Sequence, residues 1–177
     1  MNRIIFVGGI HGVGKSAVCK SITDKRDDLH YYSSSELINW ESSKDKEVVD
    51  VQGNQDILVQ ALESLDEIET NSILLDGHFC LLTCRGCIQE VPLSTFINMN
   101  PSLIIVISAD EEVVQNRLKT RDNKDYNIDF LREFQSYEKE YAKQVASVLK
   151  VPCFILTADE SDLLLDIIKP YLSEHFS

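Results

Sequence analysis

The feature that most constrains the fold of this chain is a glycine-rich segment near its start. Gly9–Ser16 fits the pattern G-x-x-x-x-G-K-[ST] and lies between an apolar run at residues 3–7 and a helix-like segment at residues 15–24. Glycines let a backbone wrap closely around phosphate groups, while the N–H groups at the start of the following helix point at the anion. In this position the pattern predicts a phosphate-binding loop between a strand and a helix.

Side chains around this loop indicate a nucleotide with its metal ion. Lys15 adds a mobile positive charge, and the hydroxyl of Ser16 can bind the Mg²⁺ ion that accompanies a nucleoside triphosphate. Asp76 ends a buried-type strand, from where a carboxylate either reaches the same ion through water or caps a neighbouring backbone group. We therefore predict ATP and Mg²⁺ as cofactors, with loop contacts from Gly9, Gly12, Val13, Gly14, Lys15, Ser16 and Ala17.

Apolar runs and amphipathic segments alternate along the rest of the chain. Strands are predicted at residues 3–7, 30–33, 72–76, 103–108 and 153–157. Helices are predicted at residues 15–24, from about 35, and at 54–69, 111–121, 129–150 and 160–176, with a polar loop at 42–50 and a turn around Gly86. This alternation is typical of an α/β protein whose parallel sheet is covered by helices on both faces.

Composition limits the classes of protein to which the chain can belong. With 177 residues, 44% of them hydrophobic and 26% charged, the sequence suits one globular domain over residues 1–177. The net charge of −12 disfavours a nucleic-acid partner, because binding to phosphate backbones needs a basic face. The apolar start is too short for a signal peptide, and no run of about 18 apolar residues offers a membrane span, so we expect a cytoplasmic protein.

Four polar segments follow predicted strands directly. They are the phosphate loop, Ser-Ser-Glu at 34–36, Asp-Gly-His at 76–78, and Asp110. Ligands of parallel sheets bind beyond the carboxyl ends of the strands. We therefore expect all four segments to lie around one crevice.

With the phosphate loop, "SSSEL", "LLDGH" and "LIIVISADEEVVQNRLKTR" in this order, the chain resembles an adenylate kinase-type nucleoside monophosphate kinase. The resemblance is closest to the short-lid, archaeal-type members. It implies a three-layer P-loop fold with sheet order 2-3-1-4-5, and transfer of the ATP γ-phosphate to AMP or a related monophosphate. It also implies an acceptor-side segment at about 34–70, a short lid at about 121–129, and contacts of the adenine with Thr157 and Ala158.

Two arginines precede the expected lid. Arg117 and Arg121 are four residues apart and therefore share one helix face. The resemblance assigns them to the phosphates of donor and acceptor, which makes Lys15, Arg117, Arg121 and Asp76 the predicted catalytic residues. The alternative is a solvated helix surface with ordinary arginines.

The acceptor side departs from the family pattern. Larger adenylate kinases carry arginines where this chain has Asn39 and Cys80. Other cations could take their place: Arg85, Lys44, Lys46 or Arg132. The predicted acceptor-binding residues are Ser35, Glu36, His78 and Arg85, although His78 could equally be a hydrogen-bonded histidine at a strand end.

Potential zinc ligands gather in one short stretch. His78, Cys80, Cys84 and Cys87 fall within ten residues, and Cys84-Arg-Gly-Cys87 has the spacing of a zinc knuckle. Strong zinc signals usually comprise two separated C-x-x-C pairs, so we expect free thiols in a hairpin turn.

Three functions fit the sequence. The leading hypothesis is a nucleoside monophosphate kinase. A second is an ATP-hydrolysing switch or assembly factor, whose acidic surface would suit a basic protein partner. A third is a kinase for a small hydroxyl compound, which needs a carboxylate base such as Glu36 or Asp76 near the acceptor.

Overall fold

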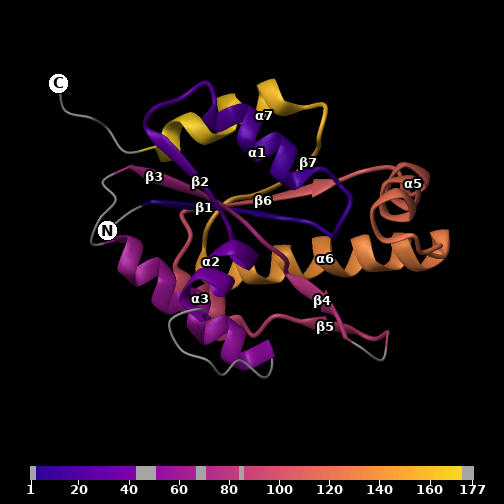
Figure 1. Cartoon of the computed structure of the whole chain (residues 1–177). Helices are drawn as coiled ribbons and strands as arrows, with labels where there is room; N and C mark the ends of the chain where they lie inside the picture. The colour runs from indigo at the N-terminus through magenta and orange to yellow at the C-terminus, as the bar shows by residue number, and fades with distance from the viewer. Residues whose placement is uncertain (1–2, 43–50, 67–70, 84–85, 173–177) are drawn as a thin grey trace.

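A five-stranded parallel sheet forms the centre of the molecule (Figure 1). The computed structural model describes residues 3–42, 51–66, 71–83 and 86–172. The strands of the sheet, in chain order, are β1 (Ile4–Gly8), β2 (Leu29–Ser33), β3 (Ser72–Asp76), β6 (Leu103–Ser108) and β7 (Cys153–Thr157). They lie in the order β2-β3-β1-β6-β7, which is the predicted order 2-3-1-4-5 when only these strands are counted.

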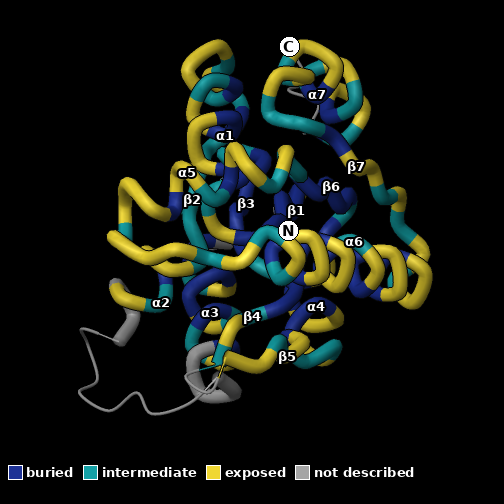
Figure 2. Tube along the Cα trace, turned by 90° about the vertical axis from the view of Figure 1, so that its right-hand side faces the viewer, coloured by how far each residue is buried: buried dark blue, intermediate teal, exposed yellow. Residues whose placement is uncertain are grey.

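Helices cover both faces of the sheet, as the alternating pattern predicts (Figures 1 and 2). One face carries α1 (Lys15–Thr23) and α7 (Ser161–Ile168). The opposite side carries α2 (Ser34–Ser42), α3 (Val51–Asp66), α4 (Leu93–Met99) and α6 (Ile128–Leu149). The remaining helix, α5 (Glu111–Asp122), lies beyond the carboxyl end of β6.

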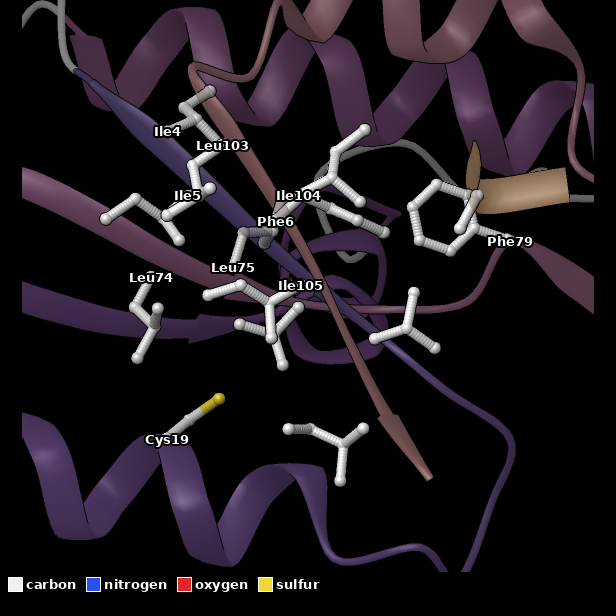
Figure 3. Close-up of a cluster of buried hydrophobic side chains, with 14 of the residues drawn as sticks. Ile4, Ile5, Phe6, Cys19, Leu74, Leu75, Phe79, Leu103, Ile104 and Ile105 are labelled. Carbon is white, nitrogen blue, oxygen red and sulfur yellow. The ribbon is translucent and has the colours of Figure 1, made fainter. Parts of the chain in front are cut away.

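The core lies where the central strands face these helices (Figure 3). Every residue of β1 and β3 is buried, because parallel strands covered on both faces require apolar side chains on both sides. The ring of Phe6 makes edge contacts with Phe79 and Phe96, with centroids 5.0 and 5.5 Å away. A Cβ atom on Gly8 would lie only 2.4 Å from the Phe79 ring, so this close packing requires the glycine.

Three elements between β3 and β6, two short strands and the helix α4, were not predicted from the sequence. The antiparallel strands β4 (Cys80–Leu82) and β5 (Ile88–Glu90) form a small hairpin on either side of the predicted turn. Gly86 has a φ of +76° in that turn, and its N–H donates to the carbonyl of Thr83. These strands are too short for their periodicity to be recognised, and α4 has only seven residues.

The ends of two predicted helices also differ. The helix predicted at 54–69 is α3 (Val51–Asp66), which begins three residues earlier, and residues 67–69 lie outside the described residues. The last predicted helix ends as α7 at Ile168 and continues as a 3-10 turn, Lys169–Tyr171, because Pro170 has no N–H for an α-helical bond. Residues 43–50 of the predicted loop, and everything after residue 172, lie outside the described residues. Within the described part of the chain, no helix has the length and hydrophobicity that crossing a membrane requires.

Candidate active site

The phosphate loop joins β1 to α1 through three glycines in unusual backbone conformations. Gly9, Gly12 and Gly14 have φ angles of +145°, +87° and +103°, a region that L side chains rarely adopt. A Cβ atom on Gly9 would also lie 2.5 Å from the carbonyl oxygen of Ile107. The spacing of glycines in the sequence thus reflects a backbone that only glycine can form at these positions.

Lys15 folds back over this loop. Its Nζ donates to the carbonyl oxygens of Gly9 at 2.7 Å and Ile10 at 3.1 Å, and only 7% of the residue is exposed. Burial lowers the pKa of Lys15, while the charges of Asp76 and Glu138 oppose that change. The ammonium group is therefore held at the base of the loop, next to the position of the predicted phosphates.

Asp76 joins the phosphate loop to the end of β3. Ser16 Oγ donates to Asp76 Oδ2 at 2.8 Å, and the hydroxyl of Tyr31 donates to the same oxygen at 2.6 Å. Ser34 Oγ donates to the Asp76 carbonyl at 2.7 Å. A hydroxyl beside a carboxylate provides the hard oxygen ligands that Mg²⁺ prefers, so the geometry fits the predicted metal-binding pair. Tyr31 was not predicted as a site residue, because the sequence of β2 does not indicate which of its side chains bonds to Asp76.

A wide pocket of about 550 Å³ opens in front of the loop. The predicted nucleotide-binding residues that line it are Gly12, Gly14, Lys15, Ser16 and Ala17 from the loop, and Ala158 from beyond β7. Of the others, Val13 is fully buried, and Gly9 contributes its carbonyl to Lys15. Thr157 does not line the pocket, because its N–H and hydroxyl bond to Glu160 Oε2.

Both predicted arginines reach this pocket, named the donor pocket after the predicted role of the phosphate loop, from α5. Arg117 Nη1 donates to the carbonyl of Gly12 at 3.0 Å, whereas Arg121 forms two bonds to the carboxylate of its neighbour Asp122. Residues 123–127 then connect α5 to α6 at the place of the expected lid. Asp110, predicted to face the crevice, instead caps α5 by accepting from Glu112 and Val113 N–H groups, and it lines neither this pocket nor the next.

A second, smaller pocket of about 240 Å³, named the acceptor pocket after the predicted role of its residues, contains Asp76 in its wall. Ser35 and His78, two of the predicted acceptor-binding residues, line it, whereas Glu36 is exposed and does not. The wall also contains Ser33, Ser34, Gln55 and Thr95, among apolar side chains such as Phe96. No lysine or arginine belongs to the lining among the described residues.

The proposed substitutes for the missing arginines are placed elsewhere or not described. Arg132 lies on the surface and pairs with Asp129 and Glu111. Arg85, Lys44 and Lys46 lie outside the described residues. At the two departing positions, Asn39 is exposed and Cys80 is fully buried, and neither lines the acceptor pocket.

His11, which sequence reasoning did not single out, lines both pockets. Its ring centroid lies 4.2 Å from that of His78, with the planes tilted by 49°. Burial and the charge of Lys15 lower the pKa of both imidazoles, that of His11 to about 4. Two neutral imidazoles therefore stand where the donor and acceptor pockets meet.

The four potential zinc ligands, which we expect to be free of metal, can be placed only in part. Cys84 lies outside the described residues, the His78 ring packs against His11, and Cys80 is buried while Cys87 is exposed. The part of the chain that the structure describes holds no group of three or more histidine, cysteine or acidic residues arranged for a metal ion.

One protein-family model matches most of this chain. The sequence model of an AAA domain matches residues 8–132, which include the phosphate loop, Asp76 and both arginines. The chain belongs to the AAA domain family. With its phosphate loop, the AAA domain described here is a nucleotide-binding P-loop protein. No curated protein sequence matches the chain significantly.

Solved structures share the architecture of this AAA domain. It is similar to the tunicamycin resistance protein of Deinococcus radiodurans, with a TM-score of 0.55, 15% identity, and coverage of 85% of this chain and 97% of that one. A shikimate kinase from Bacteroides thetaiotaomicron has a TM-score of 0.51 and 14% identity, with coverage of 95% and 97%. An uncharacterized protein from Eubacterium ventriosum has a TM-score of 0.55 and 15% identity, and the match covers 96% of this chain and 99% of that one. At these identities the likeness shows the fold alone.

Proposed function

We propose that the protein is an ATP-dependent kinase that transfers the γ-phosphoryl group of Mg-ATP to an acceptor in the smaller pocket. The observation that carries this proposal is the position of Asp76. Its carboxylate accepts a hydrogen bond from Ser16 of the donor pocket and itself lines the acceptor pocket. Phosphoryl transfer depends mainly on positioning and on cations around the moving group, and this arrangement provides both at one junction.

The remaining roles follow from the placement of the charges. Ser16 binds Mg²⁺ directly and Asp76 binds it through water, while Lys15, Arg117 and Arg121 offset the charge of the phosphates. Ala158, which lines the donor pocket, contacts the adenine. Residues 1–177 act as one domain, in which residues 34–70 hold the acceptor and the connection after α5 serves as a short lid.

The acceptor that the geometry supports best is a small, uncharged compound with a hydroxyl group. Three serines, two imidazoles and several apolar side chains line the pocket, and its described wall offers no cationic side chain to a phosphate. Asp76 is the one carboxylate in that lining, so it is suited to accept the proton of an attacking hydroxyl. Glu36, the other base considered, is excluded from the pocket.

A nucleoside monophosphate such as AMP is the second candidate acceptor. The order of the sequence motifs, which resembles that of short-lid adenylate kinases, favours this acceptor. Arg117 and Arg121 line the donor pocket, from which they would also contact the phosphate of the acceptor. Fewer charge-assisted contacts than in larger adenylate kinases would hold this acceptor. The ATP-hydrolysing switch, acting on a basic protein partner, differs from both because it needs no small acceptor.

Product analysis with ATP labelled in the γ-phosphate distinguishes these functions. One series contains AMP, dAMP, CMP, UMP, GMP and dTMP; another contains uncharged nucleosides, sugars and cyclic polyols; a third contains no acceptor. Label on an uncharged compound supports the preferred acceptor, and labelled diphosphates support the second candidate. Hydrolysis alone in every series contradicts the kinase proposal and favours the switch. Asp76→Asn should abolish transfer, whereas Asp24→Asn, a change at an exposed residue of the same charge, should not.

A further inference from the structure

A buried carboxylate that lines neither pocket lies behind both of them. Glu138 is on α6, one turn from Phe134 and Tyr141 on the buried face of the helix, and only 1% of the residue is exposed. A glutamate at such a position is unusual, because removing a charge from water costs free energy unless hydrogen bonds and opposite charges compensate for it. This position among apolar residues is the sequence signal that could have identified Glu138.

Three backbone N–H groups compensate for the burial of this carboxylate. Oε1 accepts from Gly9 and from Phe79, each at 2.8 Å, and Oε2 accepts from Cys80 at 2.7 Å. Burial raises the pKa of Glu138, while these bonds and the charge of Lys15 act in the opposite direction. A carboxylate has the acceptor positions for all three donors, whereas a neutral amide places an NH₂ group against at least one of them.

The three donors lie next to residues of the two pockets, although none of them lines a pocket itself. Gly9 is the first residue of the phosphate loop, and its carbonyl is bound by Lys15 Nζ, so its two backbone groups are held by opposite charges. Phe79 and Cys80 directly follow His78, which lines the acceptor pocket. The ring of Phe79 also stacks on Phe96, another residue of that pocket, with centroids 4.9 Å apart.

We propose that Glu138 is a positioning residue that couples the conformation of the phosphate loop to the wall of the acceptor pocket. A displacement of the Gly9 backbone on nucleotide binding moves one end of a hydrogen-bonded unit whose other end is the Phe79–Cys80 backbone. Glu138 contacts neither substrate in this arrangement. The inference rests on the proposed function to the extent that the loop must bind a nucleotide.

Nuclear magnetic resonance of the ¹⁵N-labelled full chain tests this coupling with Mg-ADP as the probe. In the wild type, the amide signals of Gly9, Phe79 and Cys80 should shift with one common apparent Kd. In Glu138→Gln, the shifts of Phe79 and Cys80 should fall at least about threefold, and the Kd for Mg-ADP should rise about tenfold, the loss expected for one charge-assisted hydrogen bond. Glu133→Gln makes the same change at an exposed position of α6 and should behave as wild type.

Each result decides the question separately from the proposed function. If Mg-ADP shifts Gly9 alone in the wild type, or if Glu138→Gln keeps both the affinity and the joint shifts, the coupling is refuted while nucleotide binding stands. If neither Mg-ADP nor Mg-ATP binds the wild type, the proposed function fails and the inference fails with it. Should Glu138→Gln not fold, the wild-type titration still decides, because it requires no substitution.

Discussion

The hydroxyl of Tyr31 donates a 2.6 Å hydrogen bond to Asp76 Oδ2, the same oxygen that accepts from Ser16. This contact crosses from β2 to β3, whose registered pairing brings Tyr31 opposite Leu74, two residues before Asp76. Burial, and then the bond to Asp76, raise the pKa of the Tyr31 phenol, so it remains a donor at neutral pH. Two hydroxyl donors thus fix the orientation of the carboxylate that stands between the pockets.

Tyr31→Phe should reduce turnover about tenfold, because a hydrogen bond to a charged group contributes about 1.5 to 3 kcal/mol. The affinity for ATP should change little, since Tyr31 does not line the donor pocket. Initial rates of ATP consumption, measured over a range of Mg²⁺ and ATP concentrations, give both quantities. Tyr137→Phe is the matched control at an exposed position, and equal losses in both variants would contradict this role of Tyr31.

Lys15→Met should abolish measurable turnover and tight ATP binding while leaving the protein folded. The sequence suggests a side chain that faces the ligand and not the core, but Lys15 is buried against the loop carbonyls. Because burial disfavours its charged form, the variant should keep its Tm within about 3 °C of wild type. Calorimetric unfolding and ATP titration measure the two effects. Lys20→Met, at an exposed position of the same helix, should bind ATP normally; unchanged kinetics in Lys15→Met would remove the loop assignment.

Arg117→Ala and Arg121→Ala should each lower turnover about a hundredfold, as expected when a cation that stabilises the charge of the transition state is lost. ATP affinity should fall much less, about threefold, because the ground-state complex keeps the loop and Lys15. Steady-state kinetics together with direct ATP titration separate the two quantities. Arg132→Ala, which removes an ion-paired surface arginine outside both pockets, should retain wild-type kinetics. Equal losses in binding and rate would instead make Arg117 and Arg121 ground-state anchors.

The sequence predicts the sheet well because each central strand is buried on both faces. Continuous apolar runs such as Ile73–Leu75 are typical of parallel strands that are covered on both faces, and the glycine-rich loop marks the end of the first strand. The hairpin Cys80–Glu90 could not be predicted in the same way. Its two strands have only three residues each, and the contact of the Cys80 N–H with Glu138 is distant in sequence.

The residues of the candidate site also differ in how well the sequence predicts them. Lys15, Ser16 and Asp76 could be predicted because the loop and the strand end place them whatever the rest of the chain does. His11 could not, because its role depends on His78, 67 residues away. For Glu138 the apolar neighbours on its helix indicate burial, but not its partner Gly9, which is 129 residues away. Glu36 stays a prediction: its residue is exposed and does not line the pocket that Ser35 lines.

The cysteines should differ strongly in reactivity. Burial, and then the charge of Glu138, raise the pKa of the Cys80 thiol to about 12, and burial also raises that of Cys19. At pH 7.5 a maleimide should therefore label the exposed Cys87 long before either of them, as peptide mass spectrometry over time would show.

Protein purified without added zinc should hold well under one zinc ion per chain. Stoichiometric zinc that is lost on Cys84→Ser would reverse this expectation.

The histidine pair should make stability depend on pH in a defined direction. Burial and the charges of Lys15 and Arg121 lower the pKa of His11 from 6.5 to about 4, whereas Asp122 and Asp76 act to raise it. Between these two pH values the unfolded chain binds a proton that folded His11 does not, so its contribution to stability, present above pH 6.5, is lost as the pH falls towards 4.

His11→Asn removes this contribution and should therefore lose less unfolding free energy than wild type over the same pH window, because an asparagine does not titrate. Urea unfolding of both proteins at intervals from pH 7.5 to 4 measures the difference, in which the carboxylates common to both largely cancel. Part of the His11 surface is exposed, so the effect should be smaller than its pKa alone implies. An imidazole titration by nuclear magnetic resonance provides the direct check. A titration midpoint for His11 at or above pH 6.5 in the folded protein would contradict the lowered pKa. The same holds if the unfolding free energies of wild type and His11→Asn change in parallel with pH.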